Sequence, residues 1–342
     1  MSDAQPPATG RIRRLADELA EHGFPLGGDD AWRALVLGEI ADAMHPAVHE
    51  RRVPSVGSIV EPQADPQTWQ RGTDLAVSRQ AVSDMELSGA RRFADGLSSW
   101  LVRRVGGDDE WVVFDRPAGS ERDLTVLADA WKATVVQRHP TGVVRVVGEF
   151  GTMRWEGWSW HHEPPIDSWV DAVAACPDHG DREVLRQLLE FAVHDLGSLG
   201  IGAIIVYRPD DPDRVAVPLG LAPAVPISEA PAVPISEERL PIPPPLQIRR
   251  AADLAPLRHA LAQVDGAAFL DASGTLRRIG VRLVPSRSAE SVVDGYRGMR
   301  HTAARRYSRD DPGATVVVVS EDGPVTVLRD GAIVGASPSP SG

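Results

Sequence analysis

The spacing of apolar residues predicts helices in the first hundred residues. Ile12, Leu15 and Leu19 follow one another at helical spacing, so we expect an amphipathic helix from Arg11 to about Gly23. A second helix is expected from Ala31 to Met44, and 88–105 is interpreted as a third. The run 51–70 carries too many Pro and Gly residues for a helix and is interpreted as a strand with loops.

Short runs of β-branched residues predict strands from residue 111 onwards. We expect a strand at 111–115 and a hairpin made of 133–138 and 142–148. The next segment, 152–165, is rich in aromatic residues. Two interpretations stay open for it: a ligand-binding platform, or a strand and turn whose rings seal a small core, which we favour.

The sequence alternates helices and strands more regularly after residue 165. Asp181 is expected to cap a helix that Gly197 ends, and a second helix is expected at 251–264. A helical region with Tyr296, Met299, Ala303 and Tyr307 follows. The strands expected here are 201–207, 266–271, 275–284, 314–320, 324–328 and 332–334.

These patterns predict an α/β (α+β) protein of two domains. We expect a mobile tail at 1–10, a smaller α+β domain at 11–165, a C-terminal domain at 166–336 with a mixed sheet flanked by helices, and a tail at 337–342. Residues 222–229 recur letter for letter at 230–237, so 222–245 is interpreted as a Pro-rich insertion that makes no packed unit.

Composition excludes several classes of protein. The chain has 342 residues, 42% of them hydrophobic, and a formal net charge of -12, which argues against a general nucleic-acid binder and against a polybasic membrane anchor. It has no apolar run near the roughly 18 to 20 residues of a membrane helix. We therefore expect a soluble, cytoplasmic protein that binds neither nucleic acid nor membrane.

Cysteine and histidine give little support for a structural metal. Cys176 is the single cysteine, which excludes an internal disulfide and any zinc module with several cysteines. His161, His162 and His179 lie near it in the sequence, but their spacing matches no standard zinc site.

Three short motifs in the C-terminal domain carry candidate chemistry. Asp265-Gly266-Ala267 places a carboxylate before a strand, and Ser320-Glu321 places another after a run of four valines. Gly298-Met299-Arg300-His301 places a guanidinium and an imidazole where a helix begins, and such a terminus suits phosphate oxygens. Each motif alone is weak, since turns, hairpin caps and solvated helix faces use the same residues.

Taken together and in this order, the motifs resemble the diadenylate cyclase domain over residues 183–335. This family condenses two ATP molecules into cyclic di-AMP. The resemblance implies a mixed sheet wrapped by helices, a divalent metal (Mg or Mn), and an active site completed when two domains meet face to face. The protein would then act as a homodimer or a higher homo-oligomer.

The resemblance also implies roles for individual residues. Asp265 would assist the attacking ribose 3′-hydroxyl and help to hold the metal, and Glu321 would be a metal ligand. Arg300 and His301 would bind phosphate oxygens. The nucleotide pocket would be lined by Gly266, Ala267, Leu283, Gly298, Thr302 and Ser320.

The sequence departs from the family's usual G-T-R-H-R motif at two positions. Met299 replaces the threonine and Thr302 replaces the last arginine, so one phosphate contact is missing or comes from a neighbour such as Arg305. Three functions therefore stay open: a cyclase regulated by an N-terminal sensor domain, a silent module that binds ATP or a cyclic dinucleotide, and a cyclase that makes a different or mixed dinucleotide.

Overall fold

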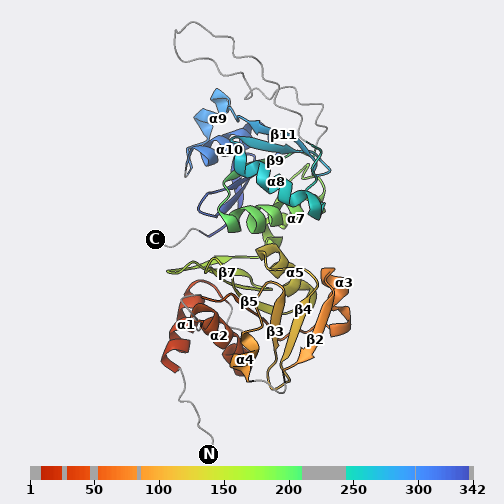
Figure 1. Ribbon diagram of the computed structural model, residues 1–342. Coiled ribbons are helices and arrows are strands. Elements are labelled where there is room, and N and C mark those ends of the chain that lie inside the picture. The colour runs from red at the N-terminus through yellow and green to blue at the C-terminus, as the bar shows by residue number, and fades with distance from the viewer. Residues whose placement is uncertain are drawn as a thin grey trace, which may run out of the picture. The chain divides into compact units, whose positions relative to one another are not determined.

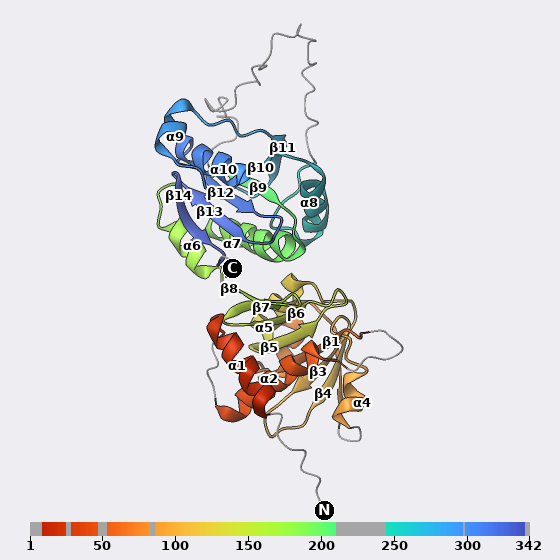
Figure 2. The same cartoon turned by 90° about the vertical axis from the view of Figure 1, so that its left-hand side faces the viewer.

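The computed structural model describes residues 9–24, 29–46, 53–82, 86–209, 244–296 and 298–338. The chain divides into two compact units, one up to Pro165 and one from Ile166. Each unit has its own mixed sheet with helices on both faces, as Figure 1 and Figure 2 show. The predicted tail at 1–10 and the Pro-rich insertion fall almost wholly outside the described residues.

The N-terminal unit is built on an eight-stranded sheet. Its strand order is β2-β4-β3-β1-β5-β6-β7-β8, and the β1–β3 pair is parallel whereas its other neighbouring pairs are antiparallel. The predicted hairpin of β5 with β6 is confirmed. The bounds are β1 (Val56–Val60), β2 (Val77–Ala81), β3 (Ser99–Arg103), β4 (Glu110–Phe114), β5 (Thr134–Arg138), β6 (Val144–Gly148), β7 (Gly151–Trp155) and β8 (Trp160–Glu163).

Helices cover both faces of this sheet because its strands alternate apolar residues between two cores. Helices α1 (Thr9–Glu21) and α2 (Asp30–Met44) confirm the two predicted helices. They lie side by side on one face of the sheet (Figure 1). The other core joins the short helix α3 (Trp69–Thr73), which follows the 3-10 turn η1 (Pro66–Thr68), to α5 (Glu121–Trp131). The rings of Trp69 and Trp131 stack in this core, with their centroids 3.8 Å apart.

The helix predicted over 88–105 is wrong. The structure has a short helix α4 (Leu87–Arg91) and then strand β3. The Asp95 carboxylate accepts hydrogen bonds from the backbone N–H groups of Leu97, Ser98 and Ser99, which turns the chain between the two elements. Trp100 is then fully buried within β3.

The aromatic segment forms the β7–β8 hairpin, which is the interpretation we favoured. Trp160 is buried in the core shared with α1 and α2, whereas Trp158 in the turn is 79% exposed. The two strands pair in antiparallel register, with Trp155 opposite Trp160. The segment therefore belongs to the large sheet and seals one of its cores.

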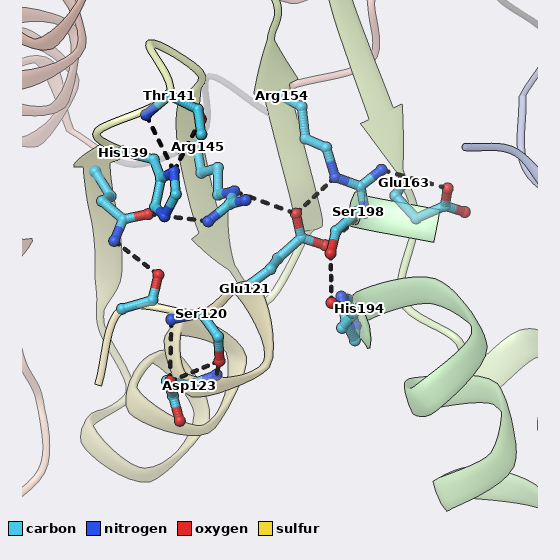
Figure 3. Close-up of polar contacts among 12 residues, drawn as sticks. Ser120, Glu121, Asp123, His139, Thr141, Arg145, Arg154, Glu163, His194 and Ser198 are labelled. Carbon is cyan, nitrogen blue, oxygen red and sulfur yellow. Dashed lines mark hydrogen bonds and ion pairs between the residues drawn. The ribbon is translucent and has the colours of Figure 1, made fainter. Parts of the chain in front are cut away.

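A buried cluster of charged residues lies between α5 and strands β6 and β7. Arg154 donates two hydrogen bonds to the Glu121 carboxylate, at 2.6 and 2.5 Å, and Arg145 lies 3.6 Å from the same carboxylate. Figure 3 shows both guanidinium groups reaching Glu121 from neighbouring strands. A carboxylate oxygen of Glu163 lies 4.0 Å from Nη1 of Arg154. We call Glu121, Arg145, Arg154 and Glu163 the Glu121 cluster.

The C-terminal unit is built on a six-stranded mixed sheet, as predicted. Its order is β11-β10-β9-β12-β13-β14, with β9 and β10 parallel and the other pairs antiparallel. The bounds are β9 (Ala203–Tyr207), β10 (Ala267–Leu270), β11 (Leu276–Val281), β12 (Thr315–Val319), β13 (Val325–Arg329) and β14 (Ala332–Ala336).

Helices cover both faces of this second sheet as well. One face packs on α6 (Asp167–Ala174), α7 (Arg182–Glu190), the π-helical turn η2 (Phe191–Leu196) and α8 (Ala251–Gln263), and the 3-10 turn η3 (Gly197–Leu199) follows η2. Figure 2 shows α6 against β14. The other face packs on α10 (Met299–Asp310), and α9 (Arg287–Val292) precedes α10.

The predicted helices of this unit are largely confirmed. Asp181 caps α7 by accepting from the backbone N–H of Glu183, and the helical path continues through η2 towards Gly197. The helix predicted at 251–264 ends one residue earlier, at Gln263. None of the helices in the described part of the chain is long and apolar enough to cross a membrane.

Candidate active site

The sheet topology of the C-terminal unit brings the three sequence motifs to one end of the strands. Strands β9 and β10 are parallel, and both begin at this end. Strand β12 runs antiparallel to β9 and finishes there, since Val319 pairs with Ala203. Asp265 therefore lies just before β10 and Glu321 just after β12. We call this end the site end of the sheet.

Arg300, in the first turn of α10, contacts both carboxylates. Its Nη1 donates a hydrogen bond of 2.8 Å to Oε1 of Glu321, and its Nη2 lies 3.8 Å from Oδ1 of Asp265. The Asp265 side chain is fully exposed, and that of Arg300 is 42% exposed. The structure thus joins three residues that are far apart in the sequence, and we call them the Arg300 triad.

Gly202 is a residue of this site that the sequence analysis missed. A Cβ atom on Gly202 would overlap Nη1 of Arg300 and would lie 2.7 Å from Cγ of Glu321. The position of Arg300 therefore depends on a missing side chain at the start of β9. The signal in the sequence was a glycine immediately before a buried apolar strand.

The start of α10 offers backbone donors next to the triad. Gly298 precedes the helix with extended backbone angles, and a Cβ there would have no heavy atom within 4 Å. The first turn of a helix leaves backbone N–H groups for an external acceptor. Met299, which replaces the usual threonine, is 91% exposed at this point.

His301 follows Arg300 in α10 and is buried, unlike the triad. Its residue is 6% exposed, and its ring packs edge to face against Tyr296 with centroids 5.9 Å apart. The imidazole is therefore held by the loop before α10.

The remaining predicted pocket residues lie at the same end of the sheet but have different surroundings. Gly266 has a φ of +103°, and a Cβ there would lie 2.8 Å from the backbone of Gly280, so this glycine is required by the close approach of β11. Ala267 and Leu283 are buried in the core under α10. Ser320 begins the turn to β13, where its N–H donates to the carbonyl of Pro324.

Thr302 and Arg305, at or near the position of the missing arginine, have partners in the fold. The Thr302 hydroxyl accepts a hydrogen bond from the N–H of Tyr296 and donates one to its carbonyl, so it fastens the preceding loop to α10. Nε of Arg305 donates to the carbonyl of Gly331 in the β13–β14 turn. This contact directs Arg305 towards that turn.

The two acids of the triad suit a hard divalent cation. Mg²⁺ is usually held by one or two carboxylates together with substrate phosphates and water, and Asp265 with Glu321 supplies such a pair. No group of three or more His, Cys, Asp or Glu side chains placed to hold a metal occurs among the residues that the structure describes. A metal bound here would therefore need phosphate or water ligands as well.

Two family models match the sequence. The first, described as the probable sensor domain DACNK, matches residues 13–163. The second, the DAC model described as DisA bacterial checkpoint controller nucleotide-binding, matches residues 245–333. The second range is shorter than the resemblance over 183–335, but it contains all three residues of the Arg300 triad.

The chain is also similar to parts of solved structures. One is a double mutant of DacA from Staphylococcus aureus, with 20% identity, 46% of this chain and 87% of that chain covered, and a TM-score of 0.26. Another is a hypothetical membrane spanning protein from Bacillus cereus, with 20% identity, 44% and 62% covered, and a TM-score of 0.27. The comparison with curated proteins gives no match. The two family models therefore carry the assignment.

Proposed function

Because the chain belongs to the diadenylate cyclase (DAC) domain family and carries a DACNK sensor domain, we propose that it condenses two ATP molecules into cyclic di-AMP under the control of its N-terminal unit. One observation carries this proposal. Arg300 contacts both Asp265 and Glu321 at the site end of the sheet, so a cation and two acids face the same point.

Asp265 and Arg300 have distinct tasks in this reaction. Asp265 takes up the proton of the 3′-hydroxyl of one ATP as its oxygen attacks the α-phosphorus of the other. A bond from the 3′-oxygen to phosphorus forms, the bond to the bridging oxygen breaks, and pyrophosphate leaves with its electron pair. Arg300 and the first N–H groups of α10 bind the phosphate oxygens, where charge develops.

The two carboxylates of the site also serve the metal, which we propose is Mg or Mn. Asp265 and Glu321 would hold the ion, which when bound neutralises charge on the triphosphate and on the leaving pyrophosphate. We propose that His301 binds the phosphates together with Arg300. Its imidazole packs edge to face against Tyr296.

The exposure of the triad supports a site shared between two copies. The Glu321 side chain is 72% exposed and that of Asp265 fully exposed, so one unit alone does not enclose a nucleotide. We propose that the site ends of two protomers meet, each holding one ATP. Each 3′-hydroxyl would then attack the nucleotide held by the partner.

The experiment is to incubate the full chain with ATP and Mn²⁺ or Mg²⁺ and to identify products by mass spectrometry. Cyclic di-AMP and pyrophosphate are expected from the native protein, with a large loss in Asp265→Asn. A matched control is Asp330→Asn, an exposed aspartate of the same unit that pairs with Arg309. No product from the native protein, or undiminished product from Asp265→Asn, contradicts the proposal.

A second candidate function rests on Thr302 and Arg305. Thr302 stands where the family motif has its second arginine, and its hydroxyl is bonded to Tyr296. The nearby Arg305 donates to the carbonyl of Gly331 instead of replacing that arginine at the start of α10. A unit of this kind would hold ATP or a cyclic dinucleotide without turnover. Calorimetry that shows tight binding without product would favour this module, and offering GTP together with ATP would reveal a cyclase that makes a mixed dinucleotide.

A further inference from the structure

Arg300 has a carboxylate partner on either side. Its guanidinium reaches Oε1 of Glu321 at 2.8 Å through one nitrogen and Oδ1 of Asp265 at 3.8 Å through the other. We infer that Arg300 is the resting counter-ion of these two carboxylates and competes with the divalent metal for them. This inference rests on the proposed function only in taking Asp265 and Glu321 as the metal ligands.

The competition follows from the lone pairs and the charges involved. A divalent ion needs carboxylate oxygens as direct ligands, at about 2.0 to 2.1 Å for Mg²⁺. Oε1 of Glu321 points one of its lone pairs at Nη1 of Arg300. In addition, two cations cannot share this space without repulsion, so Arg300 must leave its position when the acids take up a metal.

The backbone at Gly202 makes the resting position of Arg300 possible. A Cβ on this residue would overlap Nη1 and lie 3.4 Å from Cζ of Arg300. The φ of Gly202 is not in the left-handed region, so the backbone angles do not demand glycine here. What the position supplies is space for the guanidinium beside Glu321.

The resting contacts can be exchanged because they are open to water. Exposed ion pairs contribute little free energy, since solvent screens them and ordering the side chains costs entropy. A nucleotide phosphate offers Arg300 an equivalent partner. Removing Arg300 from the acids favours the metal, and seating the metal on the acids frees Arg300. Metal and nucleotide therefore bind with positive coupling.

The test measures Mn²⁺ binding to the full chain without nucleotide, by calorimetry or by the electron paramagnetic resonance signal of free Mn²⁺. Arg300→Ala is expected to bind Mn²⁺ about three- to tenfold more tightly than the native protein. Arg300→Gln, which keeps the length but not the charge, is expected to behave likewise. Glu321→Gln in the Arg300→Ala background should remove the gain.

Arg309→Ala is the matched control. Arg309 lies on the same helix, its side chain is 47% exposed, and it pairs with Asp330 at 2.6 Å. Its loss is expected to leave Mn²⁺ binding unchanged, because Asp330 is not part of the triad. A similar gain in Arg309→Ala would show a general effect of net charge and would overturn the inference.

The outcomes separate this inference from the proposed function. Equal or weaker Mn²⁺ binding by Arg300→Ala overturns the inference, as does a gain that Glu321→Gln leaves in place. Neither result depends on turnover. A protein that makes no cyclic di-AMP but gains Mn²⁺ affinity through Arg300→Ala would keep the inference and contradict the cyclase. Melting temperatures of the variants establish that each one is folded.

Discussion

The two units contain clusters made of the same residue types in opposite surroundings. In the Glu121 cluster, the side chain of Glu121 is 0% exposed and that of Arg154 is 10% exposed. In the Arg300 triad, the arginine is 42% exposed and Asp265 is fully exposed. Both clusters set guanidinium groups against carboxylates, so burial is what distinguishes them.

Burial fixes the partners of the first cluster. Burial alone would lower the pKa of Arg154, but the Glu121 carboxylate outweighs it and holds that pKa above its ordinary value. Burial lowers the pKa of Arg145, and Arg154 adds to this effect although Glu121 opposes it. Charges enclosed in this way cannot change partners cheaply. The buried cluster therefore stabilises the fold, whereas the exposed triad can exchange its ion pairs for ligands.

The largest expected effect comes from breaking the closed cluster. Glu121→Gln leaves Arg145 and Arg154 without their shared negative charge, and we expect the N-terminal unit to lose about 3 to 5 kcal/mol of stability. Eight of the nine tryptophans lie in this unit, so denaturant unfolding followed by tryptophan fluorescence reports on it. Glu149→Gln, an exposed glutamate of the same unit, is the control. A loss as small as that of the control would contradict a structural role for the cluster.

The corresponding change in the open triad should spare the fold and stop the chemistry. Asp265→Asn is expected to lower cyclic di-AMP formation by about 10²- to 10³-fold, which is the usual cost of losing one preorganised contact to developing charge. Because the Asp265 side chain is fully exposed, the melting temperature of the variant should stay close to that of the native protein. A variant that unfolds early would place Asp265 with the structural residues instead.

A smaller effect is expected from filling the space at Gly202. A Cβ at Gly202 would lie 2.7 Å from Cγ of Glu321, so Gly202→Ala displaces a proposed metal ligand. Because Glu321 is a flexible side chain, we expect activity to fall by only about tenfold, or ~1.4 kcal/mol. Gly38→Ala, where a Cβ would meet nothing within 4 Å, serves as the control in the same assay. Full activity of Gly202→Ala would show that the space beside Glu321 has no bearing on catalysis.

The smallest expected effect concerns Asp271, a buried carboxylate of the C-terminal unit. Burial would raise the pKa of Asp271, but hydrogen bonds from Ser273, Thr275 and Arg277 outweigh it and lower that pKa below its ordinary value. The Asp271 carboxylate thus contributes to the free energy of unfolding above its unfolded pKa of about 3.9. This contribution is lost as the pH falls through the lower pKa of the folded state.

Replacing the Asp271 carboxylate tests the direction of this pH dependence. Asp271→Asn is expected to lower the free energy of unfolding by about 1 kcal/mol at neutral pH. The amide oxygen of the variant keeps the backbone hydrogen bonds, but the negative charge that faces Arg277 is lost. The stability of this variant should also fall less steeply with acid. An acid limb as steep as that of the native protein would assign the pH dependence to other groups.

Much of the fold was predictable because local patterns and tertiary contacts agree. Strands β9, β12 and β13 are rich in β-branched residues, and α1, α2 and α8 follow helical spacing. The error at 88–105 has a tertiary cause. Ala90, Ala94, Leu97 and Leu101 recur at helical spacing, which favours a helix over the whole segment. The Asp95 turn and the burial of Trp100 in a sheet decide for a strand. Helix α5 and strand β2 were not predicted.

The site was predictable only through the resemblance, since each motif alone also fits a turn or a cap. The convergence of Asp265, Arg300 and Glu321 depends on which strands begin and end at the same place, and sequence spacing does not give that order. The partners of Thr302 and the space at Gly202 depend on packing between elements distant in the sequence.

The most direct test of the account is a structure of the full chain with Mn²⁺ and 3′-deoxy-ATP, which lacks the attacking hydroxyl. We predict that the anomalous signal of Mn²⁺ lies against Asp265 and Glu321, and that Arg300 has turned from them to the phosphate oxygens at the start of α10. A triphosphate bound away from these residues, or an Arg300 still paired with both acids beside a bound nucleotide, would contradict the account.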